Sequence, residues 1–259
     1  MLRAVQHRLM GIPAAVVTSW ATAFLLNAVL IAWAQRLPLL TRAGWVHAGI
    51  LGTVLWGCLG WRGWITVVLY LALGSLVTRV GFKRKQEQGL AEARGGRRSP
   101  ANVWGSAAVG ALLALLIGAG LEPGQLLLVG FAASFAAKLA DTFGSEIGKR
   151  YGRTTVLITT FRRVSPGTEG AVSLEGTAAS AIGSLVMTLV VVVVKLVPAG
   201  PVAWLVAGVG LVATLLESLL GALAQERTPW LSNEVVNGLQ TAVAALLAMA
   251  ICAQFQLLA

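Results

Sequence analysis

The sequence predicts an all-α fold, a polytopic integral membrane helical bundle with about seven to eight transmembrane helices. Hydrophobic residues make up 57% of its 259 residues and charged residues only 12%, and the mean hydropathy is +0.79. Soluble domains carry about 25% charged residues, so this composition excludes a soluble globular protein. The segments that approach the roughly 20 apolar residues of a crossing helix are 13–34, 43–60, 64–80, 101–119, 125–143, 174–197, 202–224 and 234–257.

The first three segments lie in a region without any carboxylate, residues 1–80. The apolar run of the first segment, about 20 residues, exceeds the 7–15 residues of a signal-peptide core, so we expect a retained anchor. Segments 43–60 and 64–80 are short and meet at a Trp-Arg-Gly turn. A single hairpin that does not fully cross the membrane is the alternative to two crossings there. We interpret residues 1–80 as hydrophobic anchoring and packing helices.

The net charge of +10 is concentrated between particular helices. With eight crossings, most Lys and Arg residues collect on one side, chiefly in 81–100 and 144–173. The positive-inside rule places these two loops in the cytoplasm. Arg3 and Arg8 favour a cytoplasmic N-terminus instead, which seven crossings would satisfy. The two basic loops share a side under either count.

Residues 81–259 form the predicted catalytic membrane domain, which includes both basic loops. The chain has ten Asp and Glu residues, and four of them lie within 141–176. Polar groups at this density between two membrane-length segments point to chemistry on a polyanion. No phosphate-binding P-loop, dinucleotide fingerprint or nucleophile elbow occurs in the sequence.

One face of the helix expected over 125–143 and its extension carries four polar residues at positions i, i+3, i+7 and i+11, Lys138, Asp141, Ser145 and Lys149. Ionisable groups within a span predict a functional site, whereas Lys138 and Asp141 could also simply neutralise each other. Glu146 lies about 140° from Asp141 around an ideal helix. The two carboxylates could therefore share Mg²⁺ only if Gly144 breaks the helix.

Two further strings combine arginines with glycines and hydroxyl or amide groups. Arginine forks match phosphate oxygens and Gly-rich turns expose backbone N–H groups. The alternatives are ordinary positive-inside residues for the first string and contact with anionic lipid headgroups for the second. The strings hold Thr159, Thr160, Arg162, Arg163, Gly167, Thr168 and Glu169, and then Arg94, Arg97, Arg98 and Asn102.

The last three segments add a few isolated polar groups. Glu175 opens a helix, where capping is the alternative to metal binding. Glu217 lies inside a span and is expected to face a polar cavity. Asn233 and Asn237 precede Gln240 at helical spacing, so they either complete the site or make interhelical hydrogen bonds.

Four strings in order carry a family resemblance, RGGRRSPANVWGS, DTFGSEIGKRYGRTTVLITTF, GTEGAVSLEGTAAS and SNEVVN. They resemble the transmembrane protein 19 family, whose photosynthetic members include the phytyl-phosphate kinase of tocopherol synthesis and phytol salvage. The resemblance covers about 81–257. It implies an isoprenyl-phosphate kinase that converts phytyl phosphate to phytyl diphosphate with a nucleoside triphosphate, CTP being the favoured donor.

Phosphoryl transfer relies on positioning, charge stabilisation and metal ions that bridge the donor phosphates. We therefore expect Mg²⁺ on Asp141 and Glu146 with Glu169 or Glu175, and catalytic roles for Asp141, Glu146 and Lys149. The expected partners are phytyl phosphate, the nucleotide and the bilayer, with no nucleic acid. The expected location is a bacterial inner or thylakoid membrane with a cytoplasmic active site. The residues expected to bind phosphate or nucleotide are Arg94, Arg97, Arg98, Asn102, Ser145, Thr159, Thr160, Arg162, Arg163, Gly167, Thr168, Asn233 and Asn237.

A transporter of a lipid-linked or small anionic substrate is the main alternative, because charged residues inside interrupted helices are also typical of transporters. The polar groups collect at one membrane face, however, and no inverted repeat is visible. A lipid-binding scaffold does not explain four carboxylates beside arginines. The DGxxAR-type string of CDP-alcohol phosphotransferases is absent.

Overall fold

The structure, a computed structural model, describes residues 14–225 and 228–258 and confirms the all-α prediction. Seven helices in these ranges are long and apolar enough to span a membrane. They are α2 (Ala14–Ala34), α3 (Arg42–Arg79), α5 (Pro100–Gly118), α6 (Gly124–Tyr151), α7 (Leu174–Val193), α8 (Pro201–Ala224) and α9 (Asn233–Gln254). The short elements are α4 (Phe82–Glu87), a 3₁₀ turn η1 (Ala93–Gly96) and an antiparallel hairpin of β1 (Thr155–Leu157) and β2 (Ala171–Ser173).

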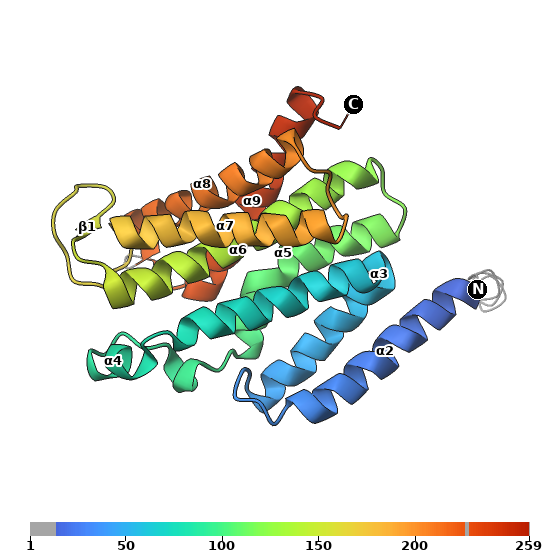
Figure 1. Cartoon of the computed structure of the whole chain (residues 1–259), viewed down its shortest axis with the longest axis horizontal. Helices are drawn as coiled ribbons and strands as arrows, with labels where there is room; N and C mark the ends of the chain where they lie inside the picture. The colour runs from blue at the N-terminus through green and yellow to red at the C-terminus, as the bar shows by residue number, and fades with distance from the viewer. Residues whose placement is uncertain (1–13, 226–227, 259) are drawn as a thin grey trace.

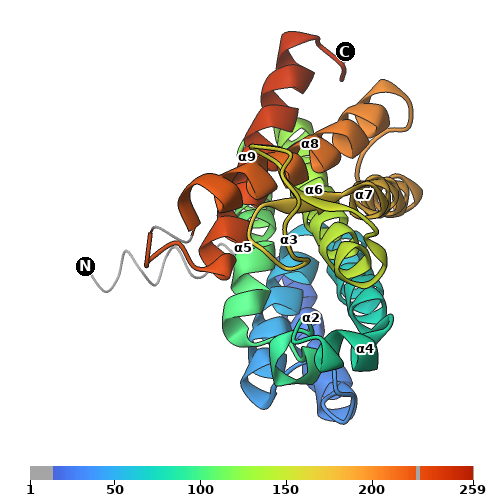
Figure 2. The ribbon, with the colours of Figure 1, turned by 90° about the vertical axis from the view of Figure 1, so that its left-hand side faces the viewer.

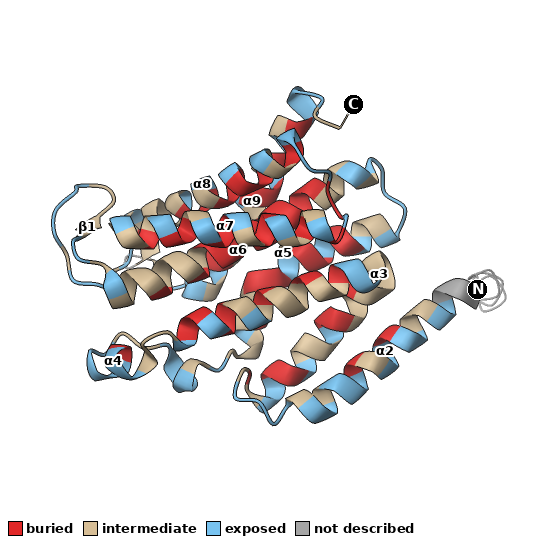
Figure 3. Ribbon diagram, viewed as in Figure 1, coloured by how far each residue is buried: buried red, intermediate tan, exposed pale blue. Residues whose placement is uncertain are grey.

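Helix α6 occupies the centre of the bundle. It packs against α3, α5, α7, α8 and α9, and these helices surround it in the end-on view of Figure 2. Every residue from Val129 to Ala140 is buried, and Figure 3 shows this stretch of α6 as buried while α2 at the edge is largely exposed. A helix enclosed in this way is expected to be apolar all round, and residues 126–137 are apolar except for Ser134.

Helix α3 folds back on itself at Gly60, as Figure 1 shows. Gly60 has φ 66° and ψ −163°, a conformation that is essentially restricted to glycine. Arg79 Nη2 donates to Pro38 O at 3.1 Å, so the last residue of α3 lies beside the segment that precedes its first residue. Each leg is about 18 residues or roughly 27 Å long, close to the thickness of the hydrocarbon core. The segments expected at 43–60 and 64–80 are thus two legs of one bent helix, with the bend at residue 60 instead of 61–63.

The two basic segments, 81–100 and the one after α6, lie at the same end of the bundle (Figure 1), which confirms that they share a side. The opposite end holds the bend of α3, where Arg62 Nη1 donates to Lys195 O at 3.5 Å. Arg3 and Arg8, on which the alternative with seven crossings rests, lie outside the described residues. We call the end that carries α4, η1 and the β1–β2 hairpin the basic end.

Helices α3, α5, α7 and α9 all begin at the basic end on a hydroxyl residue. The side chains of Thr41, Ser99, Ser173 and Ser232 each accept a hydrogen bond from the backbone N–H three residues later. Such caps satisfy N–H groups that a helix start leaves without a partner. The caps therefore direct four helix N-termini, each with a partial positive charge, toward one end of the molecule.

Substituting Gly60 by alanine tests the bend. The conformation at Gly60 is strained for any side chain, so we expect Gly60→Ala to lower the free energy of unfolding by about 1–3 kcal/mol. Gly208→Ala is the matched control, because Gly208 lies inside α8 with no neighbouring atom within 4 Å of an added Cβ. Thermal unfolding in detergent measures both variants, and equal midpoints would contradict the bend.

Candidate active site

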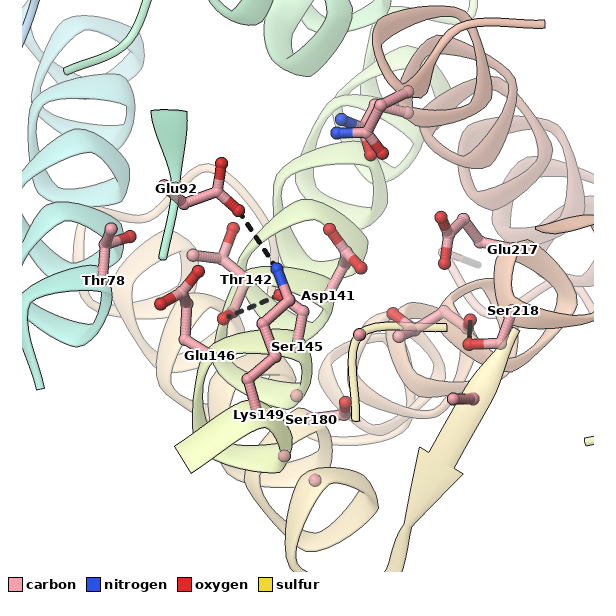
Figure 4. A pocket seen from close by; sticks show the side chains of 18 of the residues that line it. Thr78, Glu92, Asp141, Thr142, Ser145, Glu146, Lys149, Ser180, Glu217 and Ser218 are labelled. Carbon is pink, nitrogen blue, oxygen red and sulfur yellow. Dashed lines mark hydrogen bonds and ion pairs between the residues drawn. The ribbon is translucent and has the colours of Figure 1, made fainter. Parts of the chain in front are cut away.

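A polar cavity of about 230 Å³ lies at the basic end. Its walls come from the η1 segment, the start of α5, the last turns of α6, the loop 166–173, the start of α7, the end of α8 and the start of α9. Segments that lie far apart in the sequence thus meet around one space. Figure 4 shows this cavity from close by.

The predicted polar face of α6 forms the floor of this cavity. All four of its members, Lys138, Asp141, Ser145 and Lys149, line the cavity. Lys138 is buried, forms an ion pair with Asp141 and donates to Asn237 Oδ1 at 2.8 Å. A buried ammonium group needs such partners, because leaving it unpaired is very costly. Lys138 therefore links the floor to α9 and orients Asp141.

Glu217 on α8 faces Asp141 across the cavity in Figure 4. Its charged neighbours are Asp141, Lys138 and Glu169. The expectation that Glu217 faces a polar cavity is confirmed. Several carboxylates therefore meet near the lysines of α6, on the side of the cavity formed by α8.

The other side of the cavity is a basic arm, residues 92–98. Arg94, Arg97 and Arg98 line the cavity, as does Asn102. Asn102 Oδ1 accepts from Arg94 Nη2 at 3.0 Å and from Ser99 N at 2.9 Å, while its amide donates to Glu234 Oε1 at 3.0 Å. The Asn102 side chain thus connects the basic arm to α9 through these hydrogen bonds. The carboxylate of Glu92, which the sequence reasoning did not assign to the site, lies 3.3 Å from Lys149 Nζ.

The segment that connects β1 to β2 reaches the cavity only in part. Gly167, Thr168 and Glu169 line the cavity. The predicted phosphate-binding residues of the preceding turn do not line it, so the structure does not bring these four to the cavity, Thr159, Thr160, Arg162 and Arg163.

Local backbone pairing keeps this turn away from the cavity. Arg162 O accepts from Leu157 N at 2.9 Å and Thr155 O accepts from Val164 N at 3.0 Å, so residues 162–164 pair with β1. The turn between them projects into solvent, with Phe161 76% exposed and Arg162 and Arg163 also exposed.

Helix α6 continues unbroken through Gly144 to Tyr151, which corrects both the expected interruption and the expected loop start at residue 144. Gly144 packs against Ser180 of α7 so closely that no side chain would fit. Without a break, Glu146 points away from Asp141. It is 2% exposed and pairs with Lys85 of α4, which is completely buried and also donates to Thr78 O at 2.9 Å.

Lys85 is a residue that the sequence analysis placed among ordinary loop charges. Its partner lies 61 residues away, and helical periodicity gives no signal over such a separation. The pair fastens α4 onto the end of α6. Glu146 therefore pairs with Lys85, and it also lines the cavity.

Glu175 lies in the first turn of α7, where it accepts from Arg153 N at 3.3 Å. It does not line the cavity, so the structure does not bring it together with Asp141 there. Among the described residues, no three His, Cys, Asp or Glu side chains are grouped closely enough to hold a metal ion by themselves. Mg²⁺ often uses only one or two carboxylates together with substrate phosphates and water. Asp141, with Glu217 opposite, fits this second arrangement.

Both predicted asparagines of α9, Asn233 and Asn237, line the cavity. Gln240 instead donates to Thr214 Oγ1 at 3.1 Å and Ala137 O at 3.2 Å, within the helix packing. Asn237 therefore fits both interpretations of this polar row, since it lines the cavity and also accepts a hydrogen bond from Lys138 on α6, whereas Gln240 makes interhelical hydrogen bonds.

Comparison with known proteins identifies relatives over most of the chain. Residues 25–245 match the family described as integral membrane protein DUF92. An uncharacterized membrane protein of Synechocystis sp. is 48% identical over 242 residues, which cover 92% of this chain and 93% of that protein. An uncharacterized membrane protein of Methanocaldococcus jannaschii is 32% identical over 231 residues, which cover 88% and 92%.

Protein VTE6, chloroplastic, of Arabidopsis thaliana is 40% identical over 217 residues, which cover 81% of this chain but 64% of that protein. No solved structure matches the chain significantly. The family match extends through all four motifs singled out from the sequence, and it confirms that they mark a family of membrane proteins.

A double-mutant cycle tests the buried pair of Lys85 and Glu146. Removing one partner leaves an uncompensated buried charge, so Lys85→Met or Glu146→Leu alone should lower the free energy of unfolding by roughly 3–5 kcal/mol. The double variant should regain most of that loss, because neither charge remains. Thermal unfolding in detergent measures the effect. Additive losses in the double variant would contradict the pairing.

Proposed function

The chain belongs to the DUF92 family of integral membrane proteins, and we propose that it is a phosphotransferase that converts phytyl phosphate to phytyl diphosphate. A nucleoside triphosphate, with CTP favoured, is the donor, and Mg²⁺ is the cofactor. The observation that carries the proposal is the cavity at the basic end, where arginines and lysines lie opposite carboxylates. The resemblance of the motifs and the relationship to a chloroplastic protein support phytyl phosphate as the acceptor.

The cavity suits two phosphate-bearing substrates. Arg94, Arg97 and Arg98 offer planar guanidinium groups that bind phosphate oxygens in pairs, and Lys149 adds a point charge from the floor. Helices α5, α7 and α9 also begin at this cavity. Their N-termini add partial positive charge and backbone donors.

Asp141 and Glu217 would hold Mg²⁺ from the protein side, with Glu169 beside them. Bound there, Mg²⁺ would neutralise charge on the donor phosphates. Lys138 keeps the Asp141 carboxylate oriented through their ion pair, and Asn237 in turn orients Lys138.

In the reaction, an oxygen of the phytyl phosphate attacks the terminal phosphorus of the donor. The bond from that phosphorus to its bridging oxygen breaks, and the nucleoside diphosphate leaves with the electron pair. The attacking oxygen already carries negative charge, so no general base is required. The contribution of the protein is therefore positioning and charge stabilisation, for which the paired lysines of α6 and the anchored basic arm are suited.

The basic end is proposed to face the cytoplasm, because Lys and Arg accumulate on cytoplasmic loops. A bacterial inner or thylakoid membrane would then hold the protein, with nucleotide entering from the aqueous side. A transporter would need its substrate site near the middle of the membrane. The position of the cavity at one end of the bundle supports the kinase over transport.

Turnover by the purified protein tests this function directly. Phytyl phosphate and Mg²⁺ are supplied with CTP, ATP, UTP or GTP in turn, and mass spectrometry detects phytyl diphosphate. We expect the most product with CTP and none after EDTA removes the metal. Folded protein that forms no product from any donor would contradict the proposal.

Two carboxylate variants test whether the reaction takes place in the cavity. Asp141→Asn removes the charge that faces Glu217, and we expect kcat to fall by at least about 10²-fold while the protein stays folded. Glu175→Gln is the control, because Glu175 lies one helix away and outside the cavity, and its kcat should remain near the wild-type value. Equal kcat values for the two variants would place the chemistry elsewhere.

A further inference from the structure

A second cavity, of about 290 Å³, lies between α2, both legs of α3 and α5. Apolar side chains dominate its lining, among them Leu30, Ile31, Leu51, Val67, Leu71 and Val103. On the outer side, Leu30, Trp33 and Leu37 are also exposed on the surface of the bundle, by 38%, 67% and 42%. We call this space the apolar groove. It is open toward the region that a bilayer would occupy.

The apolar groove adjoins the polar cavity. Arg98, Asn102 and Ser106 line both spaces. The polar head of a ligand could therefore lie in one space while its apolar part lies in the other. Nucleotides lack any part that would match the apolar groove, whereas an isoprenyl phosphate has both parts.

Arg98 is held firmly at the junction of the two spaces. Its backbone N donates to Leu39 O and its backbone O accepts from Thr41 N, both at 3.0 Å. Its guanidinium donates to Tyr70 OH at 2.6 Å and lies 5.1 Å from the centre of the Tyr70 ring. Both side-chain contacts involve neutral groups, so the positive charge stays available to an anion. A phosphate bound there would leave its tail directed into the groove.

The opposite end of the apolar groove is marked by a polar contact. Trp64 Nε1 donates to Asn27 Oδ1 at 3.0 Å, and both residues line the groove. From Ala34 to Asn27 the groove follows the last turns of α2 for about seven residues, or roughly 10 Å. This length accommodates part of an extended hydrocarbon chain along the helix.

We propose that the apolar groove between α2, α3 and α5 binds the isoprenoid tail of the phosphate acceptor, with Arg98 binding its phosphate at the junction. The inference rests on the proposed function and adds a role for the N-terminal helices, which the sequence alone presents only as anchors. The tail enters sideways from the bilayer past Leu30 and Trp33, so the acceptor need not leave the membrane.

A groove-filling variant tests the tail site by activity. Ala48 of α3 lines the apolar groove, and Ala48→Trp places an indole in it. We expect kcat/KM for a C20 isoprenyl phosphate to fall at least about tenfold, equivalent to about 1.4 kcal/mol. Turnover of the C5 dimethylallyl phosphate should stay within about twofold of wild type, because so short a tail does not need the groove.

Ala203→Trp is the matched control, since Ala203 on α8 is also partly exposed and lines neither space. It should leave both substrates unaffected. Unchanged turnover of the C20 substrate by Ala48→Trp, or an equal loss in the two variants, would overturn the assignment.

Photo-crosslinking tests the same site without turnover. Wild-type protein in detergent is labelled with a C20 isoprenyl phosphate that carries a diazirine at the end of its tail, and labelled peptides are identified by mass spectrometry. Labels within 27–72 or 103–107 support the tail site. Labels confined to α7, α8 and α9 overturn it. If the wild-type protein binds the probe in the groove but transfers no phosphate, the failure lies with the proposed function and not with the tail site.

Discussion

Charges inside an apolar bundle need partners, and α6 carries five charged residues from Lys138 to its end. Lys138 pairs with Asp141 and Asn237, Glu146 with Lys85, and Lys149 with Glu92. The isolated burial of any of these charges would cost several kcal/mol. The need to satisfy them therefore determines how α4, the basic arm and α9 are placed around the end of α6. The polar cavity is the space left between these partners.

This arrangement explains how a protein with few charged residues concentrates them in one place. The four helices that begin at the basic end are capped there by hydroxyl residues, and their N-termini reinforce the positive charge of the basic arm. Carboxylates from α6 and α8 meet opposite that arm. A polyanion bound with a divalent cation would match both sides. The apolar remainder of the bundle would give the hydrocarbon part of the proposed lipid substrate a place to bind.

Much of this structure was predictable from the sequence. Hydropathy located all seven long helices, since each must bury its backbone polar groups internally. Helical spacing also predicted the face from Lys138 to Lys149. Predictions failed where long-range pairing or strand pairing decides the outcome. Lys85 meets Glu146 across 61 residues, close packing on Ser180 keeps α6 helical at Gly144, and pairing with β1 turns Arg162 outward.

The central claim is that phosphate groups bind in the cavity at the basic end. A cryo-electron microscopy structure with phytyl phosphate and a non-hydrolysable CTP analogue tests this claim most directly. The account predicts phosphate density between Arg98, Lys149 and Asp141, with the tail of the acceptor running along α2. Phosphate density on the exposed turn at Arg162 and Arg163, or at the middle of the bundle, would contradict it.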